Sequence, residues 1–444
     1  MSSETLTVSP LRDTDDRFDR ELDADEKARD VLVEDQISPL AAESDAEVHE
    51  GERSPGTAGW LDLVGAVCVN GICYGMTNSF GVFQSYYYTH QLSSSTPTNI
   101  SWIGSIQLCL CPLLGCVSGP LFDAGYLKPL IVTGGSIYVF GLMMTSLAKV
   151  YWQYVLAHGI AVGVGMGIMF PPTVSTLSHH FGRSRYRSLA YGCQAAGSSL
   201  GGIVFPIMAR SLLPSVGFAW TVRIFGFIVL LVTIVAYLCL STVHPPRKKI
   251  AVLSPVVFRD PAYVLHVAGA GCASMAIYSP LSFAVTYGTA RGFSTSLANY
   301  SLAVINGCSV VGRIAPLLAA QVVGPINVHA SFAVISAVML FVWTKAESVP
   351  GIMVFDALYG VSSAFNAAAA SFAPYPDQVG LYIGMAFFVT SFFWLAGPPI
   401  TAALIKGNDY LYASLFCGGV VMLGGIFLFS SRYLRVRKVG TPWV

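Results

Sequence analysis

Charged side chains are rare inside the apolar segments of this sequence, and Arg313 is the clearest example. It follows a run of small and apolar residues, where a charge costs at least about 3 kcal/mol unless it is paired or faces water. Two interpretations fit this position. Arg313 either anchors an anionic or polar substrate, or it lies at the cytoplasmic end of its helix and reaches the lipid headgroups.

Asp356 is the one carboxylate that we place inside a predicted membrane segment, about one turn from the segment's start. Burial disfavours the charged form of a carboxyl group, so Asp356 is a candidate for coupling transport to protons. The alternative is an acid at the membrane interface, close to Lys345 or Arg291.

Uncharged polar residues and histidines also occur within the apolar segments. Such side chains can line a central cavity or bond neighbouring helices, and a buried histidine is more often a neutral core residue than a ligand. Besides Arg313, we select as substrate-binding residues Asn78, Asn306, Gln194 and His158. The ten cysteines lie in apolar segments without metal-site spacing, so we expect neither a metal nor a cofactor.

The elements that position these residues are long apolar segments. With 54% hydrophobic and 11% charged residues and a mean hydropathy of +0.61, the chain is unlike a soluble protein. A membrane-spanning helix needs about 20 mostly apolar residues, and this length predicts twelve of them, six on each side of a basic, proline-containing stretch. They cover residues 60–83, 100–122, 129–148, 154–177, 189–213, 220–240, 263–287, 298–320, 328–343, 352–372, 381–405 and 410–429.

Charge divides the chain further. The first 57 residues carry 17 acids and 6 bases, a net charge of −11, whereas the remaining 387 carry 7 acids and 19 bases, a net charge of +12. We predict a disordered acidic cytoplasmic tail over 1–57, an N-terminal six-helix bundle over 58–242, a basic cytoplasmic linker over 243–256, a C-terminal six-helix bundle over 257–432 and a cytoplasmic tail over 433–444.

The distribution of Lys and Arg predicts the orientation, because these residues are retained in cytoplasmic loops. Thirteen of the nineteen bases outside the acidic tail fall on one face, which places both termini in the cytoplasm. Two Asn-x-Ser triplets, at Asn99 and Asn299, then lie on the outer face as glycosylation candidates. Each adjoins a predicted helix start, where the same residues could cap the helix instead. The cell membrane is the default location, because no address signal is evident.

One loop gives the first resemblance to a known family. The stretch from Gly119 through Asp123 and Gly125 to Lys128 resembles the cytoplasmic loop motif of the major facilitator superfamily. In that family the acid pairs with bases and helix ends to hold one closed arrangement, so these four residues are candidates for gating. The usual run of arginines is reduced here to Lys128.

Other stretches resemble the monocarboxylate-porter branch of that superfamily and its fungal members. They are Asn78-Ser79-Phe80-Gly81-Val82-Phe83, Ser101-Trp102-Ile103, Gly197-Ser198-Ser199-Leu200-Gly201-Gly202, Trp220-Thr221-Val222-Arg223 and Asn306-Gly307-Cys308-Ser309-Val310-Val311-Gly312-Arg313. Proton-coupled members carry a carboxylate where this chain has Ser309 and a lysine where it has Asn78. Gln321 stands where the second half of the family usually repeats an acidic motif.

The resemblance implies an all-α polytopic membrane protein with twelve transmembrane helices in two pseudo-symmetric six-helix bundles, the major facilitator fold. It implies a secondary transporter for a small organic solute, and we expect efflux of a fungal secondary metabolite, with the lipid bilayer as partner and protons as a candidate coupling ion. Uptake of a monocarboxylate or vitamin-like solute, or a sensor without transport, is the alternative. No phosphate-binding loop, catalytic cluster or nucleic-acid site is evident, so we expect no enzyme.

Overall fold

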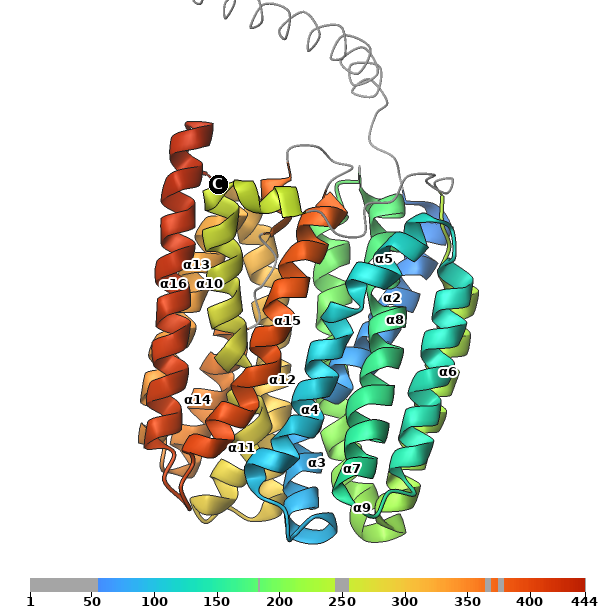
Figure 1. Cartoon of the computed structure of the whole chain (residues 1–444), viewed down its shortest axis with the longest axis vertical. Coiled ribbons are helices and arrows are strands. Elements are labelled where there is room, and N and C mark those ends of the chain that lie inside the picture. The colour runs from blue at the N-terminus through green and yellow to red at the C-terminus, as the bar shows by residue number, and fades with distance from the viewer. Residues whose placement is uncertain (1–54, 183, 244–254, 364–368, 374–378, 444) are drawn as a thin grey trace, which may run out of the picture. The chain divides into compact units, whose positions relative to one another are not determined.

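The computed structural model describes residues 55–182, 184–243, 255–363, 369–373 and 379–443, and within them the chain is helical throughout, with no strand (Figure 1). A single antiparallel bridge, between Lys406 and Asp409, closes one turn. Within these residues ten helices are long and apolar enough to cross a membrane. Apolar side chains cover much of their outer surface, as a lipid solvent requires.

The first half of the chain forms α2 to α9, which we call the first bundle. Its helices are α2 (Gly56–Asn78), α3 (Phe80–Tyr86), the π-helix η1 (Tyr87–Gln91), α4 (Pro97–Leu113), α5 (Gly115–Asp123), α6 (Leu127–Thr145), α7 (Tyr151–Tyr154), the π-helix η2 (Val155–Ala161), α8 (Val162–Phe181) and α9 (Arg187–Cys239).

The second half forms α10 to α16, the second bundle. It contains the 3-10 helix η3 (Pro255–Arg259), α10 (Pro261–Ile277), α11 (Ser279–Ala290), α12 (Thr295–Val323), α13 (Pro325–Val342), η4 (Trp343–Lys345), α14 (Val349–Ser362), η5 (Ala369–Phe372), α15 (Val379–Leu404) and α16 (Leu411–Val439).

The described helices make twelve passes of the chain. The ten long segments include α9, whose 53 residues turn back at Gly217, where φ is +77°, so this element contributes two passes. Only glycine adopts such a φ without strain. The shorter α14 adds the twelfth pass; its 14 residues are about 21 Å long. The twelve-helix architecture expected from hydropathy is therefore confirmed.

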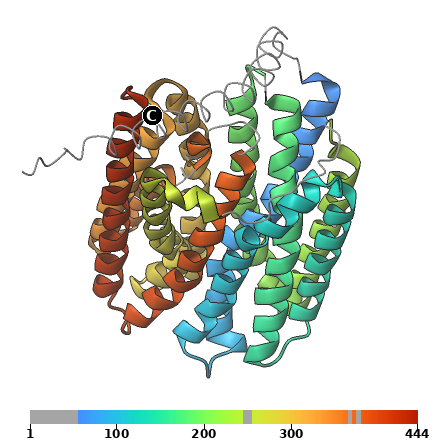
Figure 2. The same cartoon turned by 45° about the horizontal axis from the view of Figure 1, so that its top comes forward.

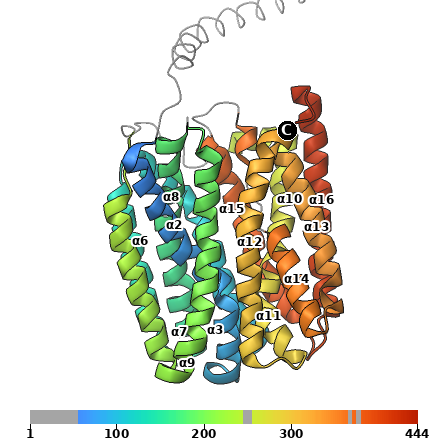
Figure 3. The same ribbon diagram turned by 180° about the vertical axis from the view of Figure 1, so that it is seen from behind.

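The two bundles lie side by side, blue to green and yellow to red in Figure 2. Within the first, α2 packs on α9 and α8, and α6 packs on α8 and α9; within the second, α10 packs on α16 and α15, and α13 packs on α16. Four pairs of helices make contacts between the bundles, namely α9 with α12, α4 with α15, α3 with α11, and α5 with α15 (Figures 1 and 3). The candidate site lies among the first three pairs.

An even number of passes brings the start of α2 and the end of α16 to the same end of the helices, which we call the terminal side (Figure 1). We call the opposite end the loop side. The first expected span ends at residue 83, whereas α3 and η1 continue the helix to Gln91, so this boundary is wrong by eight residues. Likewise α16 continues to Val439, so the tail expected from 433 is largely helical.

Two of the expected segments fall mainly outside the described residues. Of the acidic tail, residues 1–54 are not described, and α2 begins at Gly56, two residues before the expected boundary. Of the basic linker, residues 244–254 are not described, and Pro255 already begins η3. The other expected span boundaries lie close to the observed helix ends, except that the tenth span is interrupted after Ser362.

Candidate functional site

Arg313 lies in the interior of α12, ten residues before its last residue, Val323. Ten helical residues cover about 15 Å, which is half the thickness of a bilayer core. The Nε atom of Arg313 is buried and has no hydrogen-bond partner among the described residues. This depth does not fit a side chain at the cytoplasmic end of its helix, and it leaves a guanidinium group available for a ligand.

Two tyrosines, one from each bundle, lie near this arginine. Tyr74 of α2 and Tyr278, between α10 and α11, lie close enough to interact with its charge. Tyr74 packs edge-on against Phe170 of α8, with ring centroids 4.8 Å apart. Tyr278 packs in the same way against Trp394 of α15, at 5.8 Å, and the indole Nε1 of Trp394 is buried without a partner among the residues described. The site thus combines one cation, two phenols and an indole donor.

The backbone places Tyr278 in this position because the seventh membrane pass is broken there. α10 ends at Ile277, and α11 begins at Ser279 with proline in its first turn. Proline lacks an amide hydrogen, so the helix cannot continue its hydrogen-bond ladder through this point. Next to this break, the carbonyl of Ile277 accepts a hydrogen bond from the Tyr359 hydroxyl at 2.7 Å.

Asn306 lies on α12 two turns before Arg313, where it contacts the first bundle. Its side chain packs directly against Gly202 of α9, and its Nδ2 donates to the carbonyl of Leu302 at 2.9 Å. One turn further, the hydroxyls of Ser199 and Ser309 form a hydrogen bond of 2.6 Å between the bundles. The position at which the resemblance implies a carboxylate is therefore a hydroxyl contact between two helices.

Asn78 and Gln194 lie at the contact between α2 and α9. Nδ2 of Asn78 donates to the carbonyl of Ser198 at 3.4 Å, and its Oδ1 is buried without a described partner. The main-chain carbonyl of Gln194 accepts a hydrogen bond of 2.5 Å from Asn70, while its side-chain Nε2 is unpaired among the described residues. Both side chains are buried close to the bundle interface and keep one free polar atom each.

His158 lies inside the first bundle, away from Arg313. Its Nδ1 shares a hydrogen bond of 2.8 Å with the hydroxyl of Tyr87, and the rings of Phe80 and Phe83 pack against it. Tyr87 lies on η1 and His158 on η2, so two π-helical segments present the pair to each other. These contacts support the interpretation of His158 as a hydrogen-bonded core residue.

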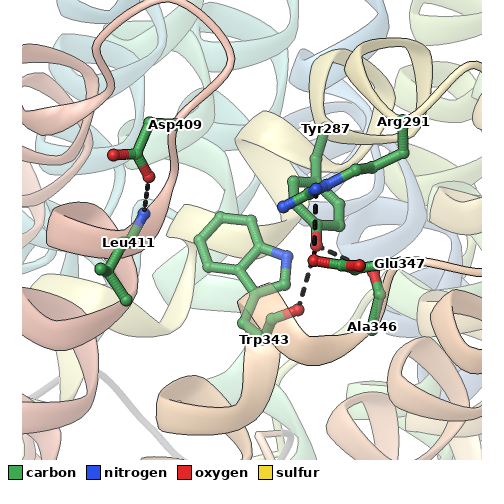
Figure 4. Close-up of polar contacts among 7 residues, drawn as sticks. All are labelled: Tyr287, Arg291, Trp343, Ala346, Glu347, Asp409 and Leu411. Carbon is green, nitrogen blue, oxygen red and sulfur yellow. Dashed lines mark hydrogen bonds and ion pairs between the residues drawn. The ribbon is translucent and has the colours of Figure 1, made fainter.

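Asp356 lies on α14 and is 3% exposed, beside Ser301 of α12; its Oδ2 has no hydrogen-bond partner among the described residues. The expected neighbour Arg291 pairs instead with Glu347, at 3.5 Å (Figure 4). Beneath that pair, the Tyr287 hydroxyl donates to the carbonyls of Ala346 and Trp343. Arg291 thus has its ion pair with Glu347, and the choice between a coupling acid and an interfacial acid at Asp356 stays a prediction.

A second buried carboxylate lies in the first membrane pass, so the prediction that Asp356 is the one acid inside a span is wrong. Asp62 of α2 has no exposed surface, and its Oδ1 accepts a hydrogen bond of 3.1 Å from the amide of Ser241, just beyond α9. His180 of α8 contacts the hydroxyl of the same serine at 3.2 Å. An acid two residues after Trp60, within the first apolar segment, was the signal in the sequence.

The expected gating loop lies between α5 and α6 on the terminal side. Gly125 has a φ of +92°, a conformation that requires glycine, whereas Gly119 has open space around it. The ammonium group of Lys128 bonds the carbonyl of Tyr237 and lies 4.7 Å from that ring, both within the first bundle. Asp123 ends α5, a helix that also contacts α15 of the second bundle.

The two glycosylation triplets lie at helix starts on the loop side. Asn99 is exposed in the first turn of α4, where the side chain of Thr96 forms the cap, so Asn99 is not the capping residue. Asn299 follows the Ser294 cap of α12, and its side chain lies outside what the structure describes. Among the described residues, no three metal-binding side chains gather in one place.

Comparison with known proteins gives one family. Residues 65–375 match the model of the Major Facilitator Superfamily. The chain is 37% identical over 409 residues to the aspyridones efflux protein apdF of Emericella nidulans, covering 90% of this chain and 82% of that one. It is 36% identical over 403 residues to the agnestins efflux protein of Paecilomyces divaricatus (87% and 91% covered) and 30% identical over 427 residues to the fujikurins efflux protein of Gibberella fujikuroi (93% and 90%).

Proposed function

Because this chain belongs to the major facilitator superfamily, we propose that it is a secondary transporter that exports a small organic metabolite from a fungal cell. The named relatives support export, since three of them are efflux proteins for aspyridones, agnestins and fujikurins. Transport proceeds by alternating access, in which the two bundles rock about a site between them. The described helices provide that arrangement.

The observation that carries the proposal is the setting of Arg313. A guanidinium group in the middle of a membrane helix is costly unless it meets an anion, a polar ligand or water. Its Nε atom lacks a partner among the described residues, and tyrosines from both bundles adjoin it. We therefore assign to Arg313 the binding of an acidic or strongly polar group of the metabolite, with Tyr74, Tyr278 and Trp394 contacting its apolar or aromatic part.

Within the superfamily, we assign the chain to the fungal members of the monocarboxylate-porter branch. With Ser309 and Asn78 at the family's usual proton-coupling positions, the proton would need another acceptor. Asp356 fits this role, because it is a buried carboxylate with a free oxygen in the same bundle as Arg313. A protonophore should then slow export by the wild type at least about tenfold and leave the residual export of Asp356→Asn unchanged.

The orientation that we propose puts the terminal side in the cytoplasm, with the cell membrane as location. Basic residues gather on the terminal side, including those of the last turns of α16; the described ones are Lys128, Arg185, Arg187, Arg259, Arg432, Arg435, Arg437 and Lys438. Retention of such residues in the cytoplasm supports this orientation.

The test compares cell extract and culture medium of the native host by untargeted mass spectrometry, with and without the gene. A compound that accumulates inside and falls outside in the deletion strain supports export and identifies the metabolite. A compound left unconsumed in the medium would indicate uptake instead, and no difference would indicate a protein without transport.

Arg313→Gln tests the assignment of the site in the same strains. We expect export to fall about 10- to 150-fold, since one charge-assisted bond contributes about 1.5–3 kcal/mol, at unchanged protein abundance. Arg259→Gln, the same change at an exposed residue of η3, is the matched control and should export normally. Normal export by Arg313→Gln would remove the arginine from the binding site.

A further inference from the structure

A small polar cavity lies between the bundles on the loop side, where α2, α3 and α4 meet α11 and α15. The residues that matter for its chemistry are Thr77, Gln84 and Ser105 from the first bundle and Tyr278, Ser282 and Pro398 from the second. The space open to the centre of a water molecule is about 10 Å³, which is room for about one water. The cavity is therefore large enough for a single heavy atom with its hydrogens.

Two side chains that line this cavity are buried and unsatisfied. Oε1 of Gln84 and Oγ of Ser105 have no hydrogen-bond partner among the described residues, and the two side chains are 4% and 1% exposed. The hydroxyl of Thr77, in contrast, donates to the carbonyl of Cys73 at 3.1 Å. A buried acceptor without a donor is costly. Oε1 of Gln84 thus accepts no hydrogen bond from the described residues that line the cavity.

The backbone around the cavity is too closely packed for the cavity to collapse. A Cβ atom on Gly81 of α3 would come within 2.5 Å of the carbonyl oxygen of Leu281 in α11, and a side chain on Gly104 would overlap with the ring of Phe80. The helices are already at their closest approach here. The free polar atoms therefore cannot be satisfied by a further movement of these helices toward each other.

The cavity adjoins the site around Arg313, because Tyr278 belongs to both. This tyrosine lines the cavity and interacts with the charge of Arg313. Because the helix breaks after Ile277, the side chain of Tyr278 lines both sites. A ligand held at Arg313 can then extend one polar substituent along Tyr278 toward Gln84.

We infer that this cavity is a second part of the substrate site, which receives one hydroxyl or N–H group of the exported metabolite. The group enters the cavity, donates a hydrogen bond to Oε1 of Gln84 and exchanges a second one with Ser105. The substrate class is then an acid, or a strongly polar compound, that also carries a free hydroxyl or amide donor. This inference rests on the proposed function, and it makes Gln84 and Ser105 determinants of specificity.

The test measures how two matched acids inhibit export of the metabolite found by the medium comparison. The probes are 4-hydroxycinnamate and 4-methoxycinnamate, which differ by one donor hydrogen. In the wild type we expect the hydroxy acid to inhibit at a concentration at least about fivefold lower, as one neutral hydrogen bond provides. In Gln84→Leu the two acids should be equivalent, and in Gln84→Glu, which keeps an acceptor oxygen, the preference should remain.

Ser105→Ala should reduce the preference about twofold or more, whereas Ser118→Ala should leave it unchanged. The hydroxyl of Ser118 is also buried on the second membrane pass, but it donates to the carbonyl of Gly167 at 2.9 Å and lies outside the cavity. Equal inhibition by the two acids in the wild type, including inhibition by neither, would overturn the inference. A preference that persists unchanged in Gln84→Leu would also overturn it. If strains with and without the gene export every compound equally, the proposed function is overturned instead.

Discussion

Helix α9 presents two faces lined by small residues, and they differ in what they contact. Toward α2, Gly197 and Gly201 lie directly against the backbone of Val67 and Gly71, within the first bundle. Toward α12, Gly202 lies against the side chain of Asn306, and Ser199 shares a hydrogen bond with Ser309, between the bundles. One face packs backbone on backbone, and the other packs backbone on side chains.

The difference corresponds to what each contact must do during transport. Two helices of one bundle move together, so their contact can be as close as backbone atoms allow. Helices of different bundles must change partners as the bundles rock, and side chains can change rotamer where backbone cannot. The face toward α12 therefore consists of contacts that can be released, whereas the face toward α2 is permanent.

Gly201→Ala should have the largest effect. Its Cβ would overlap with the carbonyl oxygen of Gly71, a backbone atom that cannot yield. We expect a loss of stability of about 3 kcal/mol or more, seen as loss of a monodisperse peak for the detergent-solubilised protein. Gly419→Ala on α16 is the control, because a Cβ there meets nothing within 4 Å. Normal behaviour of Gly201→Ala would contradict the permanent contact.

Gly202→Ala, one residue further, should fold but transport poorly. The added Cβ overlaps with the side-chain amide of Asn306, which can move aside at a cost. We expect export to fall about tenfold, equivalent to about 1.4 kcal/mol, at normal abundance. The double variant Gly202→Ala/Asn306→Ala should recover export if Asn306 only packs here. Absence of recovery would support the assignment of Asn306 to the substrate.

Ser309→Ala should lower export about fivefold, since it leaves the buried Ser199 hydroxyl unpaired at a cost of about 1 kcal/mol. Ser199→Ala should lower export less, because the Ser309 hydroxyl keeps its hydrogen bond to the carbonyl of Asn306 at 2.8 Å. In the double variant neither hydroxyl remains, and export should return toward that of the wild type. A double-mutant cycle on export rates measures this coupling. Additive effects of the two changes would show that the 2.6 Å hydrogen bond does not hold the bundles together.

Asn78→Ala should have the smallest effect on stability, below about 0.5 kcal/mol, because its hydrogen bond to Ser198 is long at 3.4 Å. Thermal unfolding in detergent measures it, with Asn70→Ala as the comparison. The amide of Asn70 bonds the Gln194 carbonyl at 2.5 Å, and its loss should cost more. A fall in export by Asn78→Ala without loss of stability would support its assignment to the substrate.

Hydropathy was sufficient to predict the twelve passes, because each exposes apolar side chains to lipid over a length set by the bilayer. It could not predict the break at Tyr278 or the π-helical segments at Tyr87 and His158, since an apolar run gives no signal for its hydrogen-bonding pattern. It also could not predict that α16 continues through basic residues to Val439, where charge predicts an interface but not the end of a helix.

The candidate site was predicted only in part. The charge of Arg313 within an apolar segment predicted a functional role, because an unpaired charge in the membrane has a large free-energy cost. Asn306 was selected as a polar residue, but its contact with Gly202 depends on which faces of two distant helices meet. Hydropathy ends the first span at residue 83, because polar residues follow, and so leaves Gln84 outside it. The structure places Gln84 in α3 with a buried side chain. Such contacts follow from the tertiary arrangement and leave little local signal.

The buried Asp62 has a mechanical consequence. Its carboxylate accepts a hydrogen bond from the amide of Ser241, and His180 forms a hydrogen bond with the hydroxyl of the same residue. Both α2 and α8 are therefore bonded to the chain where α9 ends. A force applied to the chain beyond residue 243 is then shared by three helices instead of being borne by the last turn of one. The first bundle therefore receives such a force as one unit at Ser241, without unwinding the end of α9.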